Sequence, residues 1–208
     1  SGGESTRSIL ERDALADRVR TILPRLLPYR ILADGTIAEY VHDLPVADAQ
    51  HRHTSHLLGV YPFHQITPDE TPELAVAAQR TIERKLTPEE GWEDTGWARN
   101  MLLLYAARLR RPEEAYAHLR ALKERMMSEN GLIFHPPTRG AASEFGRVYE
   151  LDGNTGLATG IAELLLQSHG GVLRLLPALP AAWREGSVRG LRARGNLTVS
   201  LVWREGRL

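Results

Sequence analysis

The spacing of the apolar residues changes once along this chain, near Gly170, and this change constrains the fold more than any other feature. Before it, apolar residues recur at helical spacing; after it, residues 187–193 and 197–203 alternate apolar with polar side chains. Helices followed by antiparallel strands predict two architectural units. We therefore expect a mainly α fold with a C-terminal β portion, divided into residues 1–170 and residues 171–208.

Five segments of the first unit are predicted to be helices from their apolar periodicity and their start and stop signals. They cover residues 9–27, 71–86, 95–109, 112–126 and 155–168. A turn at Asp34-Gly35 between apolar flanks predicts a small hairpin, and residues 171–176 are predicted to form a strand. The segment from Ser128 to Asn154 is expected to be a long loop, and such loops are usually functional or disordered.

The bulk composition argues against several classes of partner. The chain has 208 residues, with 26 basic and 26 acidic side chains and no cysteine. A zero net charge argues against a nucleic-acid or membrane-surface partner, because both need a basic excess. No apolar run is long enough for a membrane span. Residues 1–6 lack an initiator methionine and a signal-peptide pattern, so we expect a chain cut from a longer one.

The segment from His51 to His56 (HRHTSH) places three imidazoles and a guanidinium within six residues. Such groups are costly to bury without partners. They suit either a metal ion or a hydroxyl-rich ligand, since histidine and arginine supply donors in several directions. The lack of a carboxylate between the histidines, and of any cysteine, argues against a metal site. We favour a hydrogen-bonding ligand site, with a structural polar cluster as the alternative.

Asp152 is the main candidate for a catalytic carboxylate. It lies just before the predicted helix 155–168, where Gly153 can adopt positive φ and Asn154 can cap the helix. An ionised carboxylate is favoured beside a helix N-terminus. Two interpretations follow: a capped loop, or a loop that aims Asp152 into a cleft as a base or a water-orienting group.

Aromatic and acidic residues mark the entrance of the predicted helix 95–109. The segment from Gly91 to Trp97 holds two indoles and two carboxylates. Trp97 suits stacking on a sugar ring, but a core tryptophan with a cap from Asp94 or Thr95 is an equal alternative. Three further candidates for a site lie in the predicted loop: His135, Glu144 and Glu150. The alternative for the two glutamates is that they are simply solvated, as most loop carboxylates are.

The chain lacks a nucleophile-elbow motif, a phosphate-binding glycine loop and a cysteine pair. Their absence argues against the common serine-hydrolase, nucleotide-binding and zinc-finger classes. The residues by themselves indicate a polar cleft with histidine, arginine, aspartate and tryptophan, which is compatible with a carbohydrate ligand.

Six short segments follow one another in a characteristic order. They are residues 51–66 (HRHTSHLLGVYPFHQI), 95–97 (TGW), 135–137 (HPP), 152–169 (DGNTGLATGIAELLLQSH), 175–183 (LLPALPAAW) and 186–195 (GSVRGLRARG). In this order they resemble the C-terminal part of glycoside hydrolase family 95, the inverting α-L-fucosidases. Each motif is modest alone, but the shared order is specific, and the resemblance covers most of residues 30–208.

This resemblance implies part of an (α/α)6 barrel in the first unit, followed by the start of a C-terminal β domain. It also implies metal-free and cofactor-free hydrolysis of terminal α-L-fucose, usually α-1,2-linked, from oligosaccharides or glycans with inversion. By the same resemblance Asp152 acts on the water side of the sugar. Arg52 and His53 hold the fucose, and we place Trp97 and Asn154 with them as substrate-binding residues. Members of the family are often secreted or periplasmic, which leaves the compartment open.

The chain also departs from the family pattern. The family's acid glutamate and water-binding asparagines lie upstream of the histidine segment, in a part of the barrel that this chain lacks. We therefore expect the 208 residues alone to be inactive or nearly so. Between His135 and Asp152 the loop is longer than usual. The alternatives are an α-L-galactosidase of the same family, whose sugar differs by one hydroxyl, and a non-catalytic carbohydrate-binding fragment.

Overall fold

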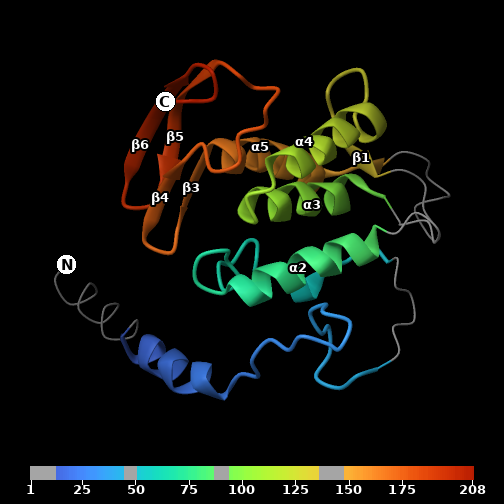
Figure 1. Ribbon diagram of the computed structural model, residues 1–208, viewed down its shortest axis with the longest axis vertical. Coiled ribbons are helices and arrows are strands. Elements are labelled where there is room, and N and C mark those ends of the chain that lie inside the picture. The colour runs from blue at the N-terminus through green and yellow to red at the C-terminus, as the bar shows by residue number, and fades with distance from the viewer. Residues whose placement is uncertain (1–12, 45–50, 87–93, 136–147) are drawn as a thin grey trace, which may run out of the picture.

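Helices dominate the structure and surround one central member. The computed structural model describes residues 13–44, 51–86, 94–135 and 148–208. Its helices include the α-helices α2 (Pro72–Lys85), α3 (Gly96–Arg108), α4 (Pro112–Ala121) and α5 (Leu151–Leu165). Two 3-10 helices (Leu23–Arg25 and Ser55–Leu57) and a π-helical turn (Leu122–Met126) accompany them. Helix α3 lies between α2 on one side and the pair α4 and α5 on the other (Figure 1).

Helix α3 is central because it is apolar on nearly all sides. Of its residues only Trp97 and Arg99 are partly exposed. Leu102 belongs to a cluster that includes the inner face of α2. Leu103 belongs to a second cluster, with α4 and with Leu164 of α5. A helix buried in this way is a rigid platform, and the candidate site is built around its first turns.

The starts of α2, α3 and α4 follow the local signals in the sequence. Pro72 and Pro112 occupy the first positions of α2 and α4, where a backbone N–H has no helical partner to lose. The Thr95 hydroxyl accepts a hydrogen bond from the Ala98 N–H at 3.2 Å and caps α3. The Thr71 hydroxyl makes no such cap and instead accepts from the preceding turn at 2.9 Å. These three predicted helix starts are confirmed.

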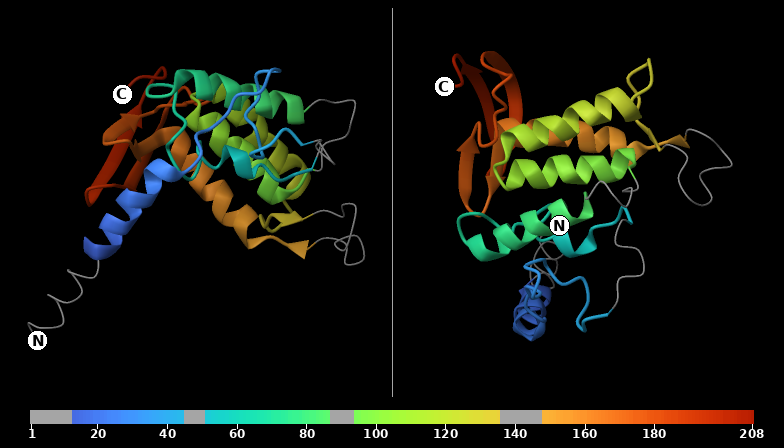
Figure 2. Two further views of the ribbon diagram at one scale, coloured as in Figure 1. Left: turned by 90° about the horizontal axis from the view of Figure 1, so that it is seen from below. Right: turned by 45° about the vertical axis from the view of Figure 1, so that its right-hand side comes forward.

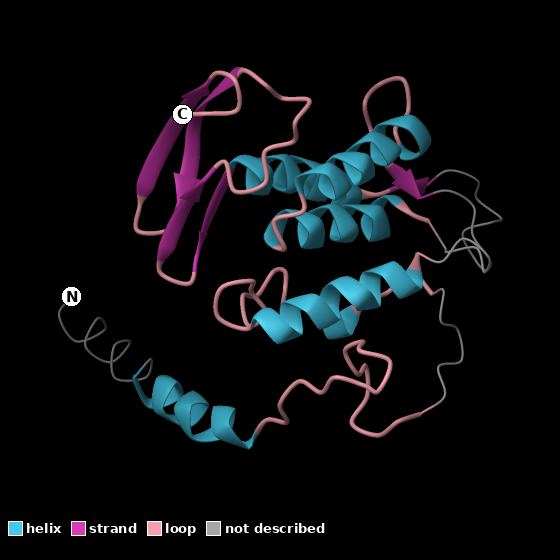
Figure 3. Cartoon of the chain, viewed as in Figure 1, coloured by secondary structure: helices cyan, strands magenta, loops and turns pink. Residues whose placement is uncertain are grey.

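Three antiparallel strand pairs complete the described chain, and the last two gather at one end of the helices (Figure 3). They are β1 (Phe134–His135) with β2 (Val148–Tyr149), β3 (Leu166–His169) with β4 (Val172–Leu175), and β5 (Gly186–Ala193) with β6 (Leu197–Trp203). Gly170 and Gly171 both have positive φ and form the two-residue turn between β3 and β4. The strands predicted after Gly170 are confirmed.

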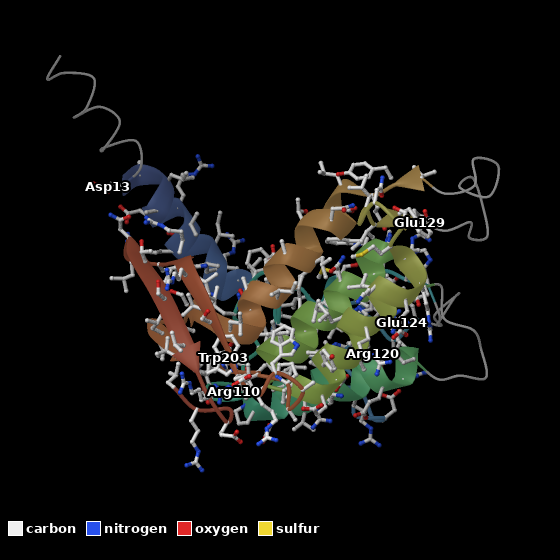
Figure 4. All side chains as sticks on the ribbon, turned by 90° about the horizontal axis from the view of Figure 1, so that it is seen from above. Asp13, Arg110, Arg120, Glu124, Glu129 and Trp203 are labelled. Atoms are coloured by element: carbon white, nitrogen blue, oxygen red, sulfur yellow. The ribbon has the colours of Figure 1, made fainter. Side chains whose placement is uncertain are left out.

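The strand part packs on the helical part through two tryptophans. Trp203, at the end of β6, is buried in a cluster with Leu165 of α5 (Figure 4), and its indole N–H donates to the Trp183 carbonyl at 2.8 Å. The Trp183 ring contacts this cluster and also the cluster of α3, α4 and α5. One side chain therefore joins the helical core to the core beneath the strands.

Helix α5 begins earlier than the sequence predicted. Its first residue is Leu151 rather than Thr155. Gly153 and Asn154 consequently lie inside its first turn, and neither the positive φ nor the Asn154 cap is present. The residue at the N-cap position is Glu150, whose backbone is extended.

The end of α5 and the preceding loop also differ from expectation. Residues 166–168 were predicted to be helical but form β3, because they pair in register with β4. Within the predicted loop 128–154, β1 and β2 form a short hairpin. Residues 136–147, which include the candidate Glu144, lie outside the described residues.

The predicted helix 9–27 is helical at residues 13–22 and ends in the 3-10 turn Leu23–Arg25. It extends away from the other helices (Figure 2). Its large apolar side chains are accordingly exposed, from 44% at Val19 to 69% at Leu27. The hairpin predicted around Asp34-Gly35 is present as a bridge between residues 31 and 37.

An α-rich part followed by antiparallel strands agrees with the predicted fold class. The partial (α/α)6 barrel that the resemblance implies is not confirmed by the described residues and stays a proposal, as does the division at residue 170. No helix within the described ranges has the length and apolarity that a membrane crossing needs.

Candidate active site

A small cavity of about 200 Å³ lies between the histidine segment and α3. Its lining residues are His53, Thr54, Ser55, Leu58, Trp97, Met101 and Tyr105. The histidine segment supplies hydroxyls and an imidazole, and α3 supplies two aromatic rings and a thioether. This mixture of polar groups with aromatic and apolar surface is typical of small-ligand sites.

The polar wall of the cavity is anchored from below. The 3-10 helix Ser55–Leu57 carries Leu57, which is fully buried beneath it. The Thr54 and Tyr105 hydroxyls are hydrogen-bonded at 2.9 Å. Burial raises the pKa of Tyr105 far above its ordinary value, so this phenol stays neutral and serves only in hydrogen bonding.

The three imidazoles of the histidine segment do not face one ligand. The rings of His51 and His53 meet edge to face, with centroids 4.7 Å apart, on the side of the cavity. Arg52, between them, is half-buried. His56 turns the other way, with its side chain 5% exposed and Nδ1 3.9 Å from the Glu39 carboxylate. No group of side chains suited to a metal ion occurs in the described residues.

Burial lowers the pKa of His56, and the Lys85 ammonium acts in the same direction while the Glu39 carboxylate opposes it. A neutral imidazole turned toward α2 is a packing group. His56 is therefore buried as expected for a structural polar cluster, whereas His53 lines the cavity.

The first turns of α3 and α5 pack against each other, next to the cavity-lining Trp97. Trp97 stands in the first turn of α3 and is half-buried. Asp152 stands in the first turn of α5, exposed, with Oδ1 accepting a hydrogen bond from the Gly153 N–H at 2.9 Å. The buried Asn100 amide ties the two helices together, because Nδ2 donates to the Gly153 carbonyl at 2.6 Å and to the Gly96 carbonyl at 3.0 Å.

A buried carboxyl, that of Glu150, lies where these two first turns meet. Glu150 is 8% exposed, and its Oε2 closely approaches the backbone of Gly96. Burial raises the pKa of Glu150, and the Asp152 charge raises it further. The backbone N–H groups of Trp97 and Gly96 and the His135 imidazole act in the opposite direction. This carboxyl is therefore coupled to Asp152 through space.

The Asn154 amide serves the protein backbone. Its Nδ2 donates to the carbonyls of Ile133 at 3.0 Å and Glu150 at 2.8 Å, and its Oδ1 accepts from the Ile133 N–H at 3.1 Å. Both amide hydrogens are thus used, and one lone pair of Oδ1 is left for a ligand. These bonds hold the chain before β1 against the start of α5.

The predicted site residues fall into two neighbouring groups. His53 and Trp97 line one cavity, with Arg52 next to His53. Asp152 and Asn154 stand in the first turn of α5, which Asn100 and Glu150 connect to the helix of Trp97.

Other candidate residues have different roles or lie outside the description. Asp94 forms a two-point ion pair with Arg99, at 3.0 and 2.5 Å, and is not the cap of α3. Glu93 is outside the described residues. Met101, Tyr105 and Asn100 were not among the site residues predicted from the sequence. A signal existed for Asn100, since it is an amide within an otherwise apolar helix run.

Comparison with known proteins places this chain among the glycoside hydrolases. Residues 4–165 match the model of the glycosyl hydrolase family 95 catalytic domain, and residues 167–208 match that of the family 95 C-terminal domain. The chain therefore belongs to glycoside hydrolase family 95.

Curated relatives agree with this membership. Alpha-L-fucosidase 2 of Arabidopsis thaliana is 38% identical over 94% of this chain, which covers 23% of that protein. A probable alpha-fucosidase A of Aspergillus niger is 30% identical over 93% of this chain and 25% of its own length. The protein of the same name from Aspergillus oryzae is 28% identical over 74% of this chain and 22% of its own. The chain thus spans about a quarter of the length of these relatives.

Proposed function

We propose that this protein takes part in the hydrolysis of terminal α-L-fucosyl residues, α-1,2-linked in oligosaccharides or glycans, with inversion at the anomeric carbon. The observation that carries the proposal is the cavity shared by His53 and Trp97, in a chain of family 95. The relatives whose names state a fucosidase activity support the choice of sugar.

Asp152 is the proposed base that accepts a proton from the attacking water. Its carboxylate is exposed in the first turn of α5, where the partial positive charge of the helix N-terminus attracts a negative group. Inversion needs a general acid on the opposite face of the sugar, with the two carboxyls roughly 6.5–9.5 Å apart to leave room for the water. We assign this acid to no residue of the present chain.

The remaining candidates are proposed to hold the sugar. Arg52 and His53 donate hydrogen bonds to ring hydroxyls, and the Trp97 indole packs on the apolar C–H face of the ring. Asn154 contributes through the remaining lone pair of Oδ1, which can accept from a sugar hydroxyl. No metal or other cofactor enters the proposed reaction.

One observation keeps an α-L-galactosidase as the second candidate. The cavity contains Leu58 and Met101, and an apolar surface discriminates only weakly against a substrate with one added hydroxyl. Comparing release of L-fucose and L-galactose from matched disaccharides separates the two. A carbohydrate-binding protein without catalysis, the third reading, would bind both and release neither.

The test is release of fucose from 2′-fucosyllactose, with the anomer followed by NMR. The assay uses this chain and the full-length protein that carries it. We expect Asp152→Asn in the full-length protein to lower kcat by about 100-fold or more, the usual size of a lost general base. Asp13→Asn, the same change at an exposed aspartate of the helix that extends away from the other helices (Figure 2), serves as the control. Normal turnover by Asp152→Asn would refute the assignment.

A further inference from the structure

We propose that Glu150 is a positioning residue that fixes the first turn of α5 against α3 and thereby aims Asp152 at the sugar. This inference rests on the function proposed for Asp152. It concerns a residue that does not itself touch the substrate.

The geometry begins with the place of Glu150 at the N-cap of α5. Its side chain turns to the start of the neighbouring helix, where the backbone N–H groups of Gly96 and Trp97 face its carboxyl. The N-terminus of a helix carries a partial positive charge, so α3 attracts this carboxyl. Glu150 therefore joins its own helix to the rigid central helix.

The junction around this carboxyl is closely packed. A Cβ added at Gly96 would collide with Glu150 Oε2 and with Ile133. A Cβ added at Gly153 would come within 2.8 Å of Ile133 Cγ2 and 3.2 Å of Glu150 Oε2. The hydrogen bond from Asn100 to the Gly153 carbonyl closes the same junction from the other side. Two glycines and one amide thus hold the helix starts at close approach around Glu150.

The chemistry of the junction argues against a role in stability alone. In the described part of the chain, Glu150 Oε2 is buried without a hydrogen-bond partner, which costs free energy that an apolar side chain would not cost. The groups that face the carboxyl are the like charge of Asp152 on α5, the His135 imidazole on β1 and the N–H groups of α3. A costly carboxyl two residues before the proposed base is best explained by its effect on that base.

The experiment compares Glu150→Ala with Glu150→Gln in the full-length protein that carries this chain. Displacement of a catalytic group by about 1 Å costs roughly 100-fold in rate. We expect Glu150→Ala to lower kcat on 2′-fucosyllactose by about 10- to 100-fold with KM within about 3-fold. Glu150→Gln keeps an oxygen for the N–H groups of α3 and is expected to retain kcat within about 3-fold.

A second measurement does not depend on activity. Backbone hydrogen exchange of residues 151–156 is expected to accelerate at least about 10-fold in Glu150→Ala, with the residues of α4 unchanged as the internal reference. Glu129→Ala, the same change at an exposed glutamate (Figure 4), should alter neither exchange nor kcat.

The outcomes separate this inference from the proposed function. Unchanged exchange at 151–156, or a wild-type kcat in Glu150→Ala, overturns the positioning role. If that result occurs while Asp152→Asn is inactive, the positioning role of Glu150 fails but the assignment of Asp152 as the base stands. If Asp152→Asn keeps full activity, the assignment of Asp152 and the positioning role both fail.

Discussion

Trp97 shows at the scale of one residue how the candidate site is made. It is one of two residues of α3 that are not buried, and it lines the cavity together with His53. Its backbone N–H faces Glu150, which holds the start of the helix that carries the indole. An aromatic ring held on a rigid helix is prepared to pack on a sugar ring with little loss of conformational entropy.

Trp97→Ala is expected to raise KM for 2′-fucosyllactose by about 10-fold, because a lost aromatic contact is worth about 0.5–1.5 kcal/mol beyond its buried area. The effect on kcat should be smaller. Trp97→Phe keeps a ring and should remain within about 3-fold of wild type. Steady-state kinetics on the full-length protein measures both values. An unchanged KM in Trp97→Ala would remove Trp97 from the sugar site.

The sequence predicted the composition of the site better than the direction of its side chains. His53 and His56 are three residues apart and chemically identical, yet one lines the cavity and the other packs toward α2. The 3-10 turn Ser55–Leu57 decides between them, and such a short turn has no apolar periodicity to reveal it. Glu150 was considered as a solvated loop carboxylate, and its burial depends on β1 and α3, which are distant in sequence.

At the scale of elements, the contact between the first turns of α3 and α5 depends on small residues. Gly96 and Gly153 stand where a Cβ would meet Ile133 and Glu150. Glycine is normally unfavourable within a helix by roughly 0.5–1 kcal/mol relative to alanine. Its presence in both first turns is explained by close packing, not by backbone conformation.

Gly96→Ala is therefore expected to destabilise the protein by about 1–3 kcal/mol, the usual cost of overpacking, although helix propensity alone favours alanine. Urea unfolding of the present chain measures the free energy of unfolding. Ala117→Gly, on the exposed face of α4, is the control that measures the difference in helix propensity between alanine and glycine. It is expected to lower the free energy of unfolding by about 1 kcal/mol. A stabilised Gly96→Ala variant would show that the junction can open without cost.

The boundaries of α5 show which elements the sequence could not define. The apolar pattern identified the helix, but its first turn was missed because the Asn154 amide bonds the backbone of Ile133, twenty-one residues away. Its last predicted residues became β3, because pairing with β4 overrides the local helical preference of Leu166 and Gln167. By contrast, α2, α3 and α4 begin at proline or threonine signals that are local, and they were predicted correctly.

At the scale of the whole molecule, two buried histidines link stability to pH. Burial lowers the pKa of His118 to about 3, and the Arg99 guanidinium, 3.1 Å from Nδ1, acts in the same direction. Burial likewise lowers the pKa of His169 to about 4, assisted by Arg108 and other neighbouring cations. Both imidazoles are 5% exposed and neutral in the fold at neutral pH.

Stability is expected to be complete above the ordinary histidine pKa of about 6.5 and to fall as pH drops toward 4, because only the unfolded chain binds the protons in this range. The loss is on the order of 1–3 kcal/mol for each histidine. Urea midpoints of the present chain at pH 7, 5.5 and 4.5 measure it. His118→Gln and His169→Gln should each flatten the dependence, and a flat wild-type profile would contradict the prediction.

The position of Trp183 has a consequence for how this protein unfolds. Its ring belongs to the core of the helices and to the core beneath the strands, and its carbonyl holds the Trp203 indole. Unfolding of the strands alone would expose one side of this ring to water, and unfolding of the helices alone would expose the other side. Partial unfolding of either part therefore costs free energy. We therefore expect the helical and strand parts, which match two separate domains of the family, to unfold together as one cooperative unit.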